Sequence, residues 1–170
     1  MHRSVRLTLA ILIAAAAGVA SRATAANTAG SVAVELTANR VTQSQGKEVL
    51  APAEKAQPGE TLQYRALYRN DGAAEAKGLM ATLPIPRGTS YVPGTAQPGR
   101  VEASLDGRTF APVPLKRTVK LADGRTVVKD VPVAEYRALR WALGTLPSKQ
   151  SRAVTARVRI EPTAVAVNAR

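Results

Sequence analysis

The sequence predicts an all-β protein, an antiparallel β-sandwich of about seven to nine strands that follows an N-terminal signal peptide. Three observations favour this fold class. Eleven prolines and twelve glycines divide the 170 residues into short segments. Several segments are rich in valine and threonine and alternate apolar with polar residues, which is the period of a half-buried strand. No long segment has the period of an amphipathic helix.

The first 26 residues have the organisation of a secretory signal peptide. Arg3 and Arg6 form a basic start, an apolar run follows from Leu7 to Ala20, and Ala23-Thr24-Ala25 supplies small residues for a signal peptidase. A membrane anchor is the alternative, but the run of about 14 residues is short of the roughly 20 that span a bilayer. The chain has no cysteine, which excludes a lipoprotein anchor. We therefore expect an exported protein, periplasmic or at the cell surface, that does not span the membrane after cleavage.

Cleavage after Ala26 leaves about 144 of the 170 residues, the length of one domain. Residues 27–30 are expected to form a flexible leader, residues 31–161 the β-sandwich, and residues 162–170 a disordered tail. The formal net charge of +12 falls to about +9 once Arg3, Arg6 and Arg22 are removed. The only histidine, His2, leaves with the signal peptide. A mature chain without histidine or cysteine excludes disulfides, thiol chemistry, serine–histidine triads and histidine metal sites, and we expect no cofactor and no metal.

Alternation and turn residues predict the strands in order. The segments expected to be extended, which we count as about seven to nine strands, are Ser31–Ala38 (with Val32, Val34 and Leu36 on one face), Arg40–Leu50, Thr61–Arg69, Lys77–Leu83, Thr89–Val92, Arg100–Leu105, Arg108–Val113, Leu115–Leu121, Thr126–Lys129, the segment around Leu139–Leu143, and Val154–Ile160. The expected turns contain Gly46, Pro58 and Gly59, Asn70-Asp71-Gly72, Gly88, Asp106-Gly107 and Asp123-Gly124. One helical turn is expected just before Leu139, at "PVAEY".

The strand Thr61–Arg69 raises the question of nucleic-acid binding, because it carries two tyrosines and two arginines. Alternation places Tyr64 and Tyr68 on one face and Arg65 and Arg69 on the other. A single-strand nucleic-acid platform needs aromatic and basic groups in the same groove. We therefore predict that the tyrosines belong to the core and the arginines to a solvated face.

Trp141 lies between Leu139 and Leu143 on the same predicted face, which indicates an anchor of the sandwich core. Stacking against a sugar is the alternative. One tryptophan and four tyrosines are too few for a broad carbohydrate platform, so the core position is favoured.

Three motifs occur in a known order: "QPGETLQYRALYRNDG" at 57–72, "LPIPRGTSYVPGTA" at 83–96 and "RWALGTLPSKQSRAVTARVRI" at 140–160. Together they resemble the bacterial conserved repeat domain family (domain of unknown function eleven) over residues 32–161. The resemblance implies an immunoglobulin-like β-sandwich module of the cell envelope, and it implies no activity. Two features depart from the family pattern: Leu83 stands where the family usually has an aspartate, and the chain holds one copy rather than a tandem array.

The carboxylates do not form a catalytic pattern. Acidic residues are scattered, Asp106 and Asp123 have turn roles before glycine, and no segment has the alternating acids of a calcium loop. A hydrolase with two carboxylates is the weakest of three functional hypotheses.

Basic residues gather around the second predicted hairpin, namely Lys116, Arg117, Lys120, Arg125 and Lys129. Such a cluster can bind an anionic polymer such as lipopolysaccharide, extracellular DNA or an acidic polysaccharide. Lysines that protect an exposed strand are the simpler explanation.

The leading hypothesis is a monomeric, non-catalytic envelope module that recognises a protein or surface partner, for which strand addition at a sheet edge is one mode. Polyanion binding by the hairpin is the alternative, and no small-molecule substrate is expected.

Overall fold

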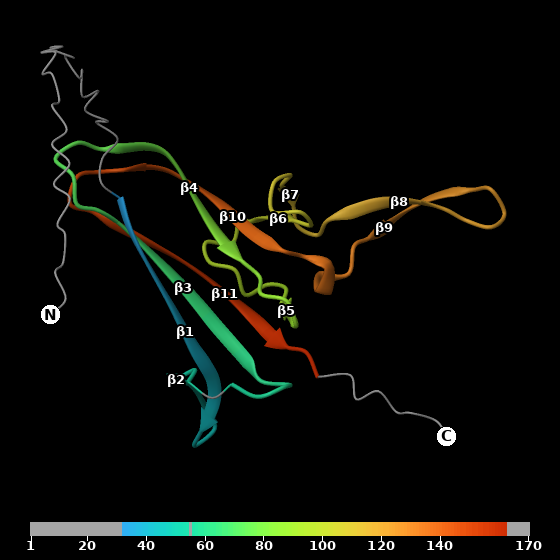
Figure 1. Ribbon diagram of the computed structural model, residues 1–170, viewed down its shortest axis with the longest axis horizontal. Coiled ribbons are helices and arrows are strands. Elements are labelled where there is room, and N and C mark those ends of the chain that lie inside the picture. The colour runs from blue at the N-terminus through green and yellow to red at the C-terminus, as the bar shows by residue number, and fades with distance from the viewer. Residues whose placement is uncertain (1–31, 55, 163–170) are drawn as a thin grey trace, which may run out of the picture.

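The computed structural model describes residues 32–54 and 56–162 (Figure 1). The predicted signal peptide, the leader and all of the predicted tail beyond Pro162 lie outside the described residues. Within the described part the chain is all-β, as predicted, with eleven strands and a single 3₁₀ turn. The elements are β1 (Val32–Ser44), β2 (Lys47–Pro52), β3 (Thr61–Asn70), β4 (Ala76–Pro84), β5 (Thr89–Tyr91), β6 (Glu102–Ser104), β7 (Ala111–Pro112), β8 (Lys116–Lys120), β9 (Thr126–Asp130), η1 (Val133–Glu135), β10 (Ala138–Leu146) and β11 (Ser151–Ile160). The strand count exceeds the expected seven to nine because β5, β6 and β7 are only two or three residues long.

The strands form three antiparallel sheets. One has five strands in the order β2-β1-β3-β11-β5, a second has four in the order β4-β10-β6-β7, and β8 and β9 form a separate two-stranded ribbon. The two larger sheets pack together as the layers of a sandwich, and the ribbon projects from one end (Figure 1). The chain passes between the layers at β3–β4, β4–β5, β5–β6 and β10–β11.

The core lies between the two sheets, where alternation predicted it. Strand β3 turns Leu62, Ala66 and Tyr68 inward while Arg65 and Arg69 stay exposed. Tyr64 shares the inward face but is only half-buried. The opposite faces of the tyrosines and arginines remove the basis for a nucleic-acid platform on this strand.

Trp141 on β10 is 2 % exposed and packs in the same core. Its indole N–H donates a hydrogen bond of 2.9 Å to the backbone carbonyl of Pro98. The ring is therefore buried and its one polar atom has a partner inside the protein. Stacking of this ring on a sugar is therefore excluded by its burial.

The predicted turns form, though not all for the expected reason. Gly59 has a φ of 87° and Gly124 a φ of 83°, a backbone conformation that L side chains rarely adopt, and Gly88 and Gly107 share it. Asn70 and Gly72 do not have positive φ, so the turn that ends β3 does not use the left-handed conformation that these residue types tolerate. The turn after β3 is instead held by the Asn70 side chain, which is fully buried and donates to the carbonyls of Ala74 and Leu146 at 2.8 and 3.0 Å.

The Asp106-Gly107 hairpin is longer than predicted. Strands β6 and β7 pair Ala103 with Ala111, so the connection is a loop rather than a two-residue turn. The Asp106 carboxylate organises this loop, because it accepts hydrogen bonds from the backbone N–H groups of Arg108 and Thr109 at 2.7 and 2.8 Å. In residues 32–54 and 56–162, no helix has the length and apolarity needed to traverse a membrane.

Candidate functional site

The first candidate site is an unpaired stretch of strand edge. Strand β1 pairs with β3 over Val32–Arg40, but it pairs with β2 only over Asn39–Ser44. No strand in the described part of the chain pairs with the other edge of Val32–Ala38, which we name the open β1 edge (Figure 1). Alternate backbone N–H and C=O groups of seven residues therefore face outward from the sheet there.

Apolar side chains line the inner face of the open β1 edge without being covered. Val34 lies opposite Tyr68, and Leu36 lies opposite Ala66, so both point to the core side of the sheet. Nevertheless Val34 is 55 % exposed and Leu36 is 51 % exposed. The four-stranded sheet covers β3 and β11 but does not extend over β1. Val34 and Leu36 therefore form an uncovered apolar surface beside the core.

The other sheet edges carry features that discourage pairing. Strand β7 has two residues and ends at Pro112, and β5 has three residues. Strand β4 pairs with β10 through an irregular register and ends at Pro84. The hydroxyl of Tyr68 also occupies the unpaired edge of β4, where it accepts the backbone N–H of Thr82 at 3.1 Å.

The open β1 edge has little comparable protection. Its nine-residue register with β3 runs without a bulge, and the stretch contains no proline and no lysine. Glu35 is its only charged residue. Lysine, proline and bulges are the usual means of blocking edge-to-edge pairing, so this edge is better suited to accept another strand than the edges of β4, β5 and β7.

The second candidate site is the β8–β9 ribbon, which holds all five basic residues of the predicted hairpin cluster. The register divides them, because residues that pair directly lie on the same face of a two-stranded ribbon. Arg117 pairs with Lys129 on one face, and Arg125 follows on that face beyond Val119 and Val127. Lys116 and Lys120 lie on the opposite face. The cluster seen in the sequence is therefore split across the ribbon.

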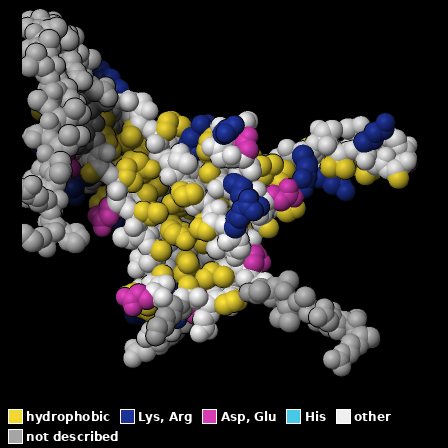
Figure 2. All heavy atoms as spheres, in the orientation of Figure 1, with side chains coloured by type: hydrophobic (Ala, Val, Ile, Leu, Met, Phe, Trp, Pro, Cys, Tyr) yellow, Lys and Arg dark blue, Asp and Glu magenta, His cyan; other side chains and the backbone are white. Residues whose placement is uncertain are grey.

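Three of these five cations have carboxylate partners. Arg117 pairs with Glu135 at 2.5 Å, Arg125 with Asp123 at 2.7 Å, and Lys116 with Asp130 at 3.5 Å. A hydrogen bond from the Arg125 backbone N–H, followed by one from its guanidinium, lowers the pKa of Asp123. Among the described residues no carboxylate pairs with Lys120 or Lys129. Figure 2 shows Lys and Arg side chains along the projecting ribbon, interspersed with hydrophobic ones.

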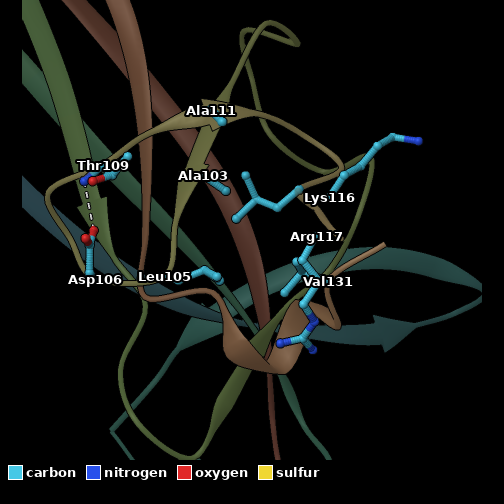
Figure 3. A pocket seen from close by; sticks show the side chains of 9 residues that line it. Ala103, Leu105, Asp106, Thr109, Ala111, Lys116, Arg117 and Val131 are labelled. Atoms are coloured by element: carbon cyan, nitrogen blue, oxygen red, sulfur yellow. Dashed lines mark hydrogen bonds between the residues drawn. The ribbon is translucent and has the colours of Figure 1, made fainter. Parts of the chain in front are cut away.

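A small hollow of about 250 Å³ lies between the base of the ribbon and the Asp106 loop (Figure 3). Its wall is largely apolar and includes Leu105, Leu115 and Val131. The polar groups near it are already engaged, since Arg117 pairs with Glu135 and Asp106 accepts from the loop backbone. Ligand sites are usually larger, about 300–1,000 Å³, and have several polar groups that converge on the ligand. Nothing in this lining is arranged to orient a cofactor.

Two further ion pairs connect strands. Arg140 pairs with Glu102 at 2.6 Å between β10 and β6, and its guanidinium stacks on the ring of Phe110. Arg157 on β11 reaches Glu48 on β2. Within the described residues no group of three or more histidine, cysteine, aspartate or glutamate side chains could hold a metal ion.

No protein-family model, curated protein or solved structure matches this chain. The resemblance to the conserved repeat domain family therefore stays a prediction. The departure at position 83, where leucine replaces the usual aspartate of that family, has a physical explanation in this fold. Leu83 is 1 % exposed in the core and lies opposite Leu139, so an aspartate at this position would bury a carboxylate in an apolar layer.

The sequence pattern indicates the ribbon but not the open β1 edge. Alternation correctly places Val32, Val34 and Leu36 on one face of a strand. It cannot reveal whether a second sheet covers that face, because coverage depends on where distant strands end.

Proposed function

We propose that this chain is a non-catalytic, exported module of the cell envelope that recognises a protein partner by strand addition at the open β1 edge. The observation that carries the proposal is the regular, unpaired edge of Val32–Ala38 with Val34 and Leu36 exposed beside it. Export is supported by the basic start, apolar run and small residues of the first 26 residues. A non-catalytic role is supported by a mature chain without histidine or cysteine, whose acidic groups are largely engaged in ion pairs and turns.

Strand addition divides recognition between backbone and side chains. The backbone of an incoming extended segment hydrogen-bonds to the outward N–H and C=O groups of β1, which supplies affinity with little sequence preference. Alternate side chains of that segment then pack beside Val34 and Leu36, which favours a partner with apolar residues at every second position. The partner class is therefore an extended apolar segment of a protein.

We also propose that the sandwich is immunoglobulin-like in the broad sense of two packed antiparallel sheets with a chain crossing between them at β3–β4. The glycine turns at 59, 88 and 124 and the buried Trp141 support this assignment and the resemblance to the conserved repeat domain family. One feature differs from the immunoglobulin pattern, in which the last two strands share a sheet. Here β10 and β11 belong to different sheets.

The experiment that tests the function is selection of displayed seven-residue peptides against the chain expressed from Asn27. We expect alternating apolar peptides to be selected and to shift the amide NMR signals of Val32–Ala38. The double substitution Val34→Lys with Leu36→Lys should abolish binding. The matched control replaces two exposed apolar residues elsewhere, Met80→Lys with Val128→Lys, and should bind as the parent does. Peptides that bind equally well to both variants would show that the edge is not the recognition site.

A second candidate function is polyanion binding by the β8–β9 ribbon. The observation that favours it is the projection of the ribbon away from the sandwich, with Lys120 and Lys129 lacking carboxylate partners among the described residues. A projecting basic arm can enter the field of an anionic polymer without a shaped pocket.

A further inference from the structure

We propose that the strand added to the open β1 edge is the segment 163–169 of a second copy of this chain, so that modules join head to tail. This inference rests on the proposed function, because it names the partner of the same edge. The segment lies outside the described residues, and its sequence is Thr-Ala-Val-Ala-Val-Asn-Ala. Thr163, Val165 and Val167 alternate with alanines, which is the pattern of a strand with one bulky and one small face.

The segment matches the edge in length and chemistry. Seven residues of segment face seven residues of open edge, Val32–Ala38. The segment has no charge and no proline between 163 and 169, and its two valines are β-branched. Val165 and Val167 are two residues apart, as are Val34 and Leu36. An antiparallel addition therefore places Val165 opposite Leu36 and Val167 opposite Val34, on the uncovered apolar surface.

The segment of the same molecule cannot occupy this edge in that register. Val158 on β11 is level with Leu62, which is level with Arg40 on β1, so Ile160 lies level with Thr42. Reaching the added-strand position beside Ala38 requires crossing three strand spacings and moving four residues back, about 19 Å in all. The three steps along the chain from Ile160 to Thr163 span at most about 11 Å. The donor must therefore come from another copy.

The geometry makes the contact heterologous. The donor segment follows the Ile160 end of β11, and the acceptor edge begins at the Val32 end of β1, and these lie at opposite ends of the five-stranded sheet (Figure 1). Each molecule therefore keeps a donor and an acceptor after one contact is made. Such head-to-tail contacts produce rings or open filaments rather than a closed dimer. This assembly replaces the monomer expected from the sequence.

The test uses two variants of the chain from Asn27 to Arg170. The acceptor variant carries Val34→Lys with Leu36→Lys, and the donor variant carries Val165→Lys with Val167→Lys. We expect the parent to form concentration-dependent oligomers in sedimentation velocity, and each variant alone to associate about 100-fold more weakly. An equimolar mixture of the two should form a complex that stops at one-to-one, because each variant keeps one intact surface. That complex also shows that both variants are folded.

Other outcomes overturn the inference in distinguishable ways. A donor variant that self-associates like the parent indicates direct β1-to-β1 pairing of two copies instead. A parent that stays monomeric, while selected peptides still bind the open β1 edge, removes the tail as partner and leaves the proposed function standing. A parent that stays monomeric and an edge that binds no peptide remove both. The control Met80→Lys with Val128→Lys should assemble as the parent does, and its failure to do so would place the contact elsewhere.

Discussion

The Tyr68 hydroxyl on β3 lies 3.1 Å from the backbone nitrogen of Thr82 on β4 and accepts its hydrogen bond. Strand β4 is at the edge of the four-stranded sheet, so a side chain of the opposite layer satisfies an edge group that would otherwise be open to pairing. The same tyrosine packs its ring in the core. One residue thus joins the layers and protects an edge, whereas the open β1 edge has no such side chain across it in the described fold.

The substitution Tyr68→Phe keeps the ring and removes only the hydroxyl. We expect it to lower the free energy of unfolding by about 1 kcal/mol, the usual net value of one part-buried hydrogen bond. Urea unfolding followed by Trp141 fluorescence measures the change. Tyr64→Phe is the matched control, because Tyr64 lies four residues before Tyr68 on the same face of β3 and is half-buried. An equal loss in both variants would show that the hydroxyl of Tyr68 contributes nothing specific.

Asn70 holds the end of β3 to the β10–β11 connection. Its amide donates to carbonyls at Ala74, Leu146 and Pro147, and its oxygen accepts from Gly72. We expect Asn70→Ala to lower the free energy of unfolding by about 3 kcal/mol, because several buried carbonyls lose their donor at once. Thermal and urea unfolding both measure it. The neighbouring substitution Asp71→Ala removes an exposed ion pair with Arg69 and should change little; a comparable loss there would contradict the assignment to the amide.

Local patterns predicted the long strands well and their surroundings poorly. Strands β3 and β11 alternate along their length and β10 alternates from Leu139 to Leu143, and the inward residues there are those that the two-residue period selects. The reason why β3 ends was missed, because Asn70 acts through carbonyls that lie more than seventy residues away in the chain. Hydrogen bonds between residues so far apart in the chain cannot be predicted from a short stretch of sequence.

The functional surfaces depended even more on how paired strands are aligned and how long each pairing is. The basic residues of the hairpin are close in sequence, yet alternation along β8 places Arg117 and Lys120 on opposite faces, and the register with β9 places Lys129 beside Arg117. The open β1 edge arises because β2 pairs only with the second half of β1. The position of Lys129 beside Arg117 and the open β1 edge follow from register and strand length, which alternation alone does not determine.

Acid should loosen the loop between β6 and β7. Hydrogen bonds from the backbone N–H groups of Arg108 and Thr109, and then from the Ser104 hydroxyl, hold the pKa of Asp106 well below its usual range. A carboxylate whose folded pKa is lowered contributes stability that is fully present above its unfolded pKa of about 3.9 and is lost as the pH falls through the folded pKa.

Comparison with Asp106→Asn measures that contribution across pH. We expect the variant to be less stable than the parent at pH 7 in urea unfolding, and the difference to shrink as the pH falls below about 4. Asp130→Asn is the control, because Asp130 is exposed and makes one long ion pair with Lys116. A difference between parent and Asp106→Asn that is the same at pH 3 and pH 7 would assign the loss to loop packing instead of to the charge.

Polyanion binding by the β8–β9 ribbon can be distinguished from nonspecific binding by the net positive charge of the whole protein. We expect the triple substitution of Lys120, Arg125 and Lys129 to glutamine to elute from heparin at a clearly lower salt concentration than the parent, with a shallower dependence of affinity on salt. The control removes three exposed cations from the five-stranded sheet, Lys47, Arg65 and Arg159, and changes the net charge equally. If the two triple variants elute together, retention reflects the overall basic charge and the ribbon has no special part in it. If the ribbon variant alone loses retention, the projecting arm is the contact surface, and the partly paired Arg125 must exchange Asp123 for the polymer.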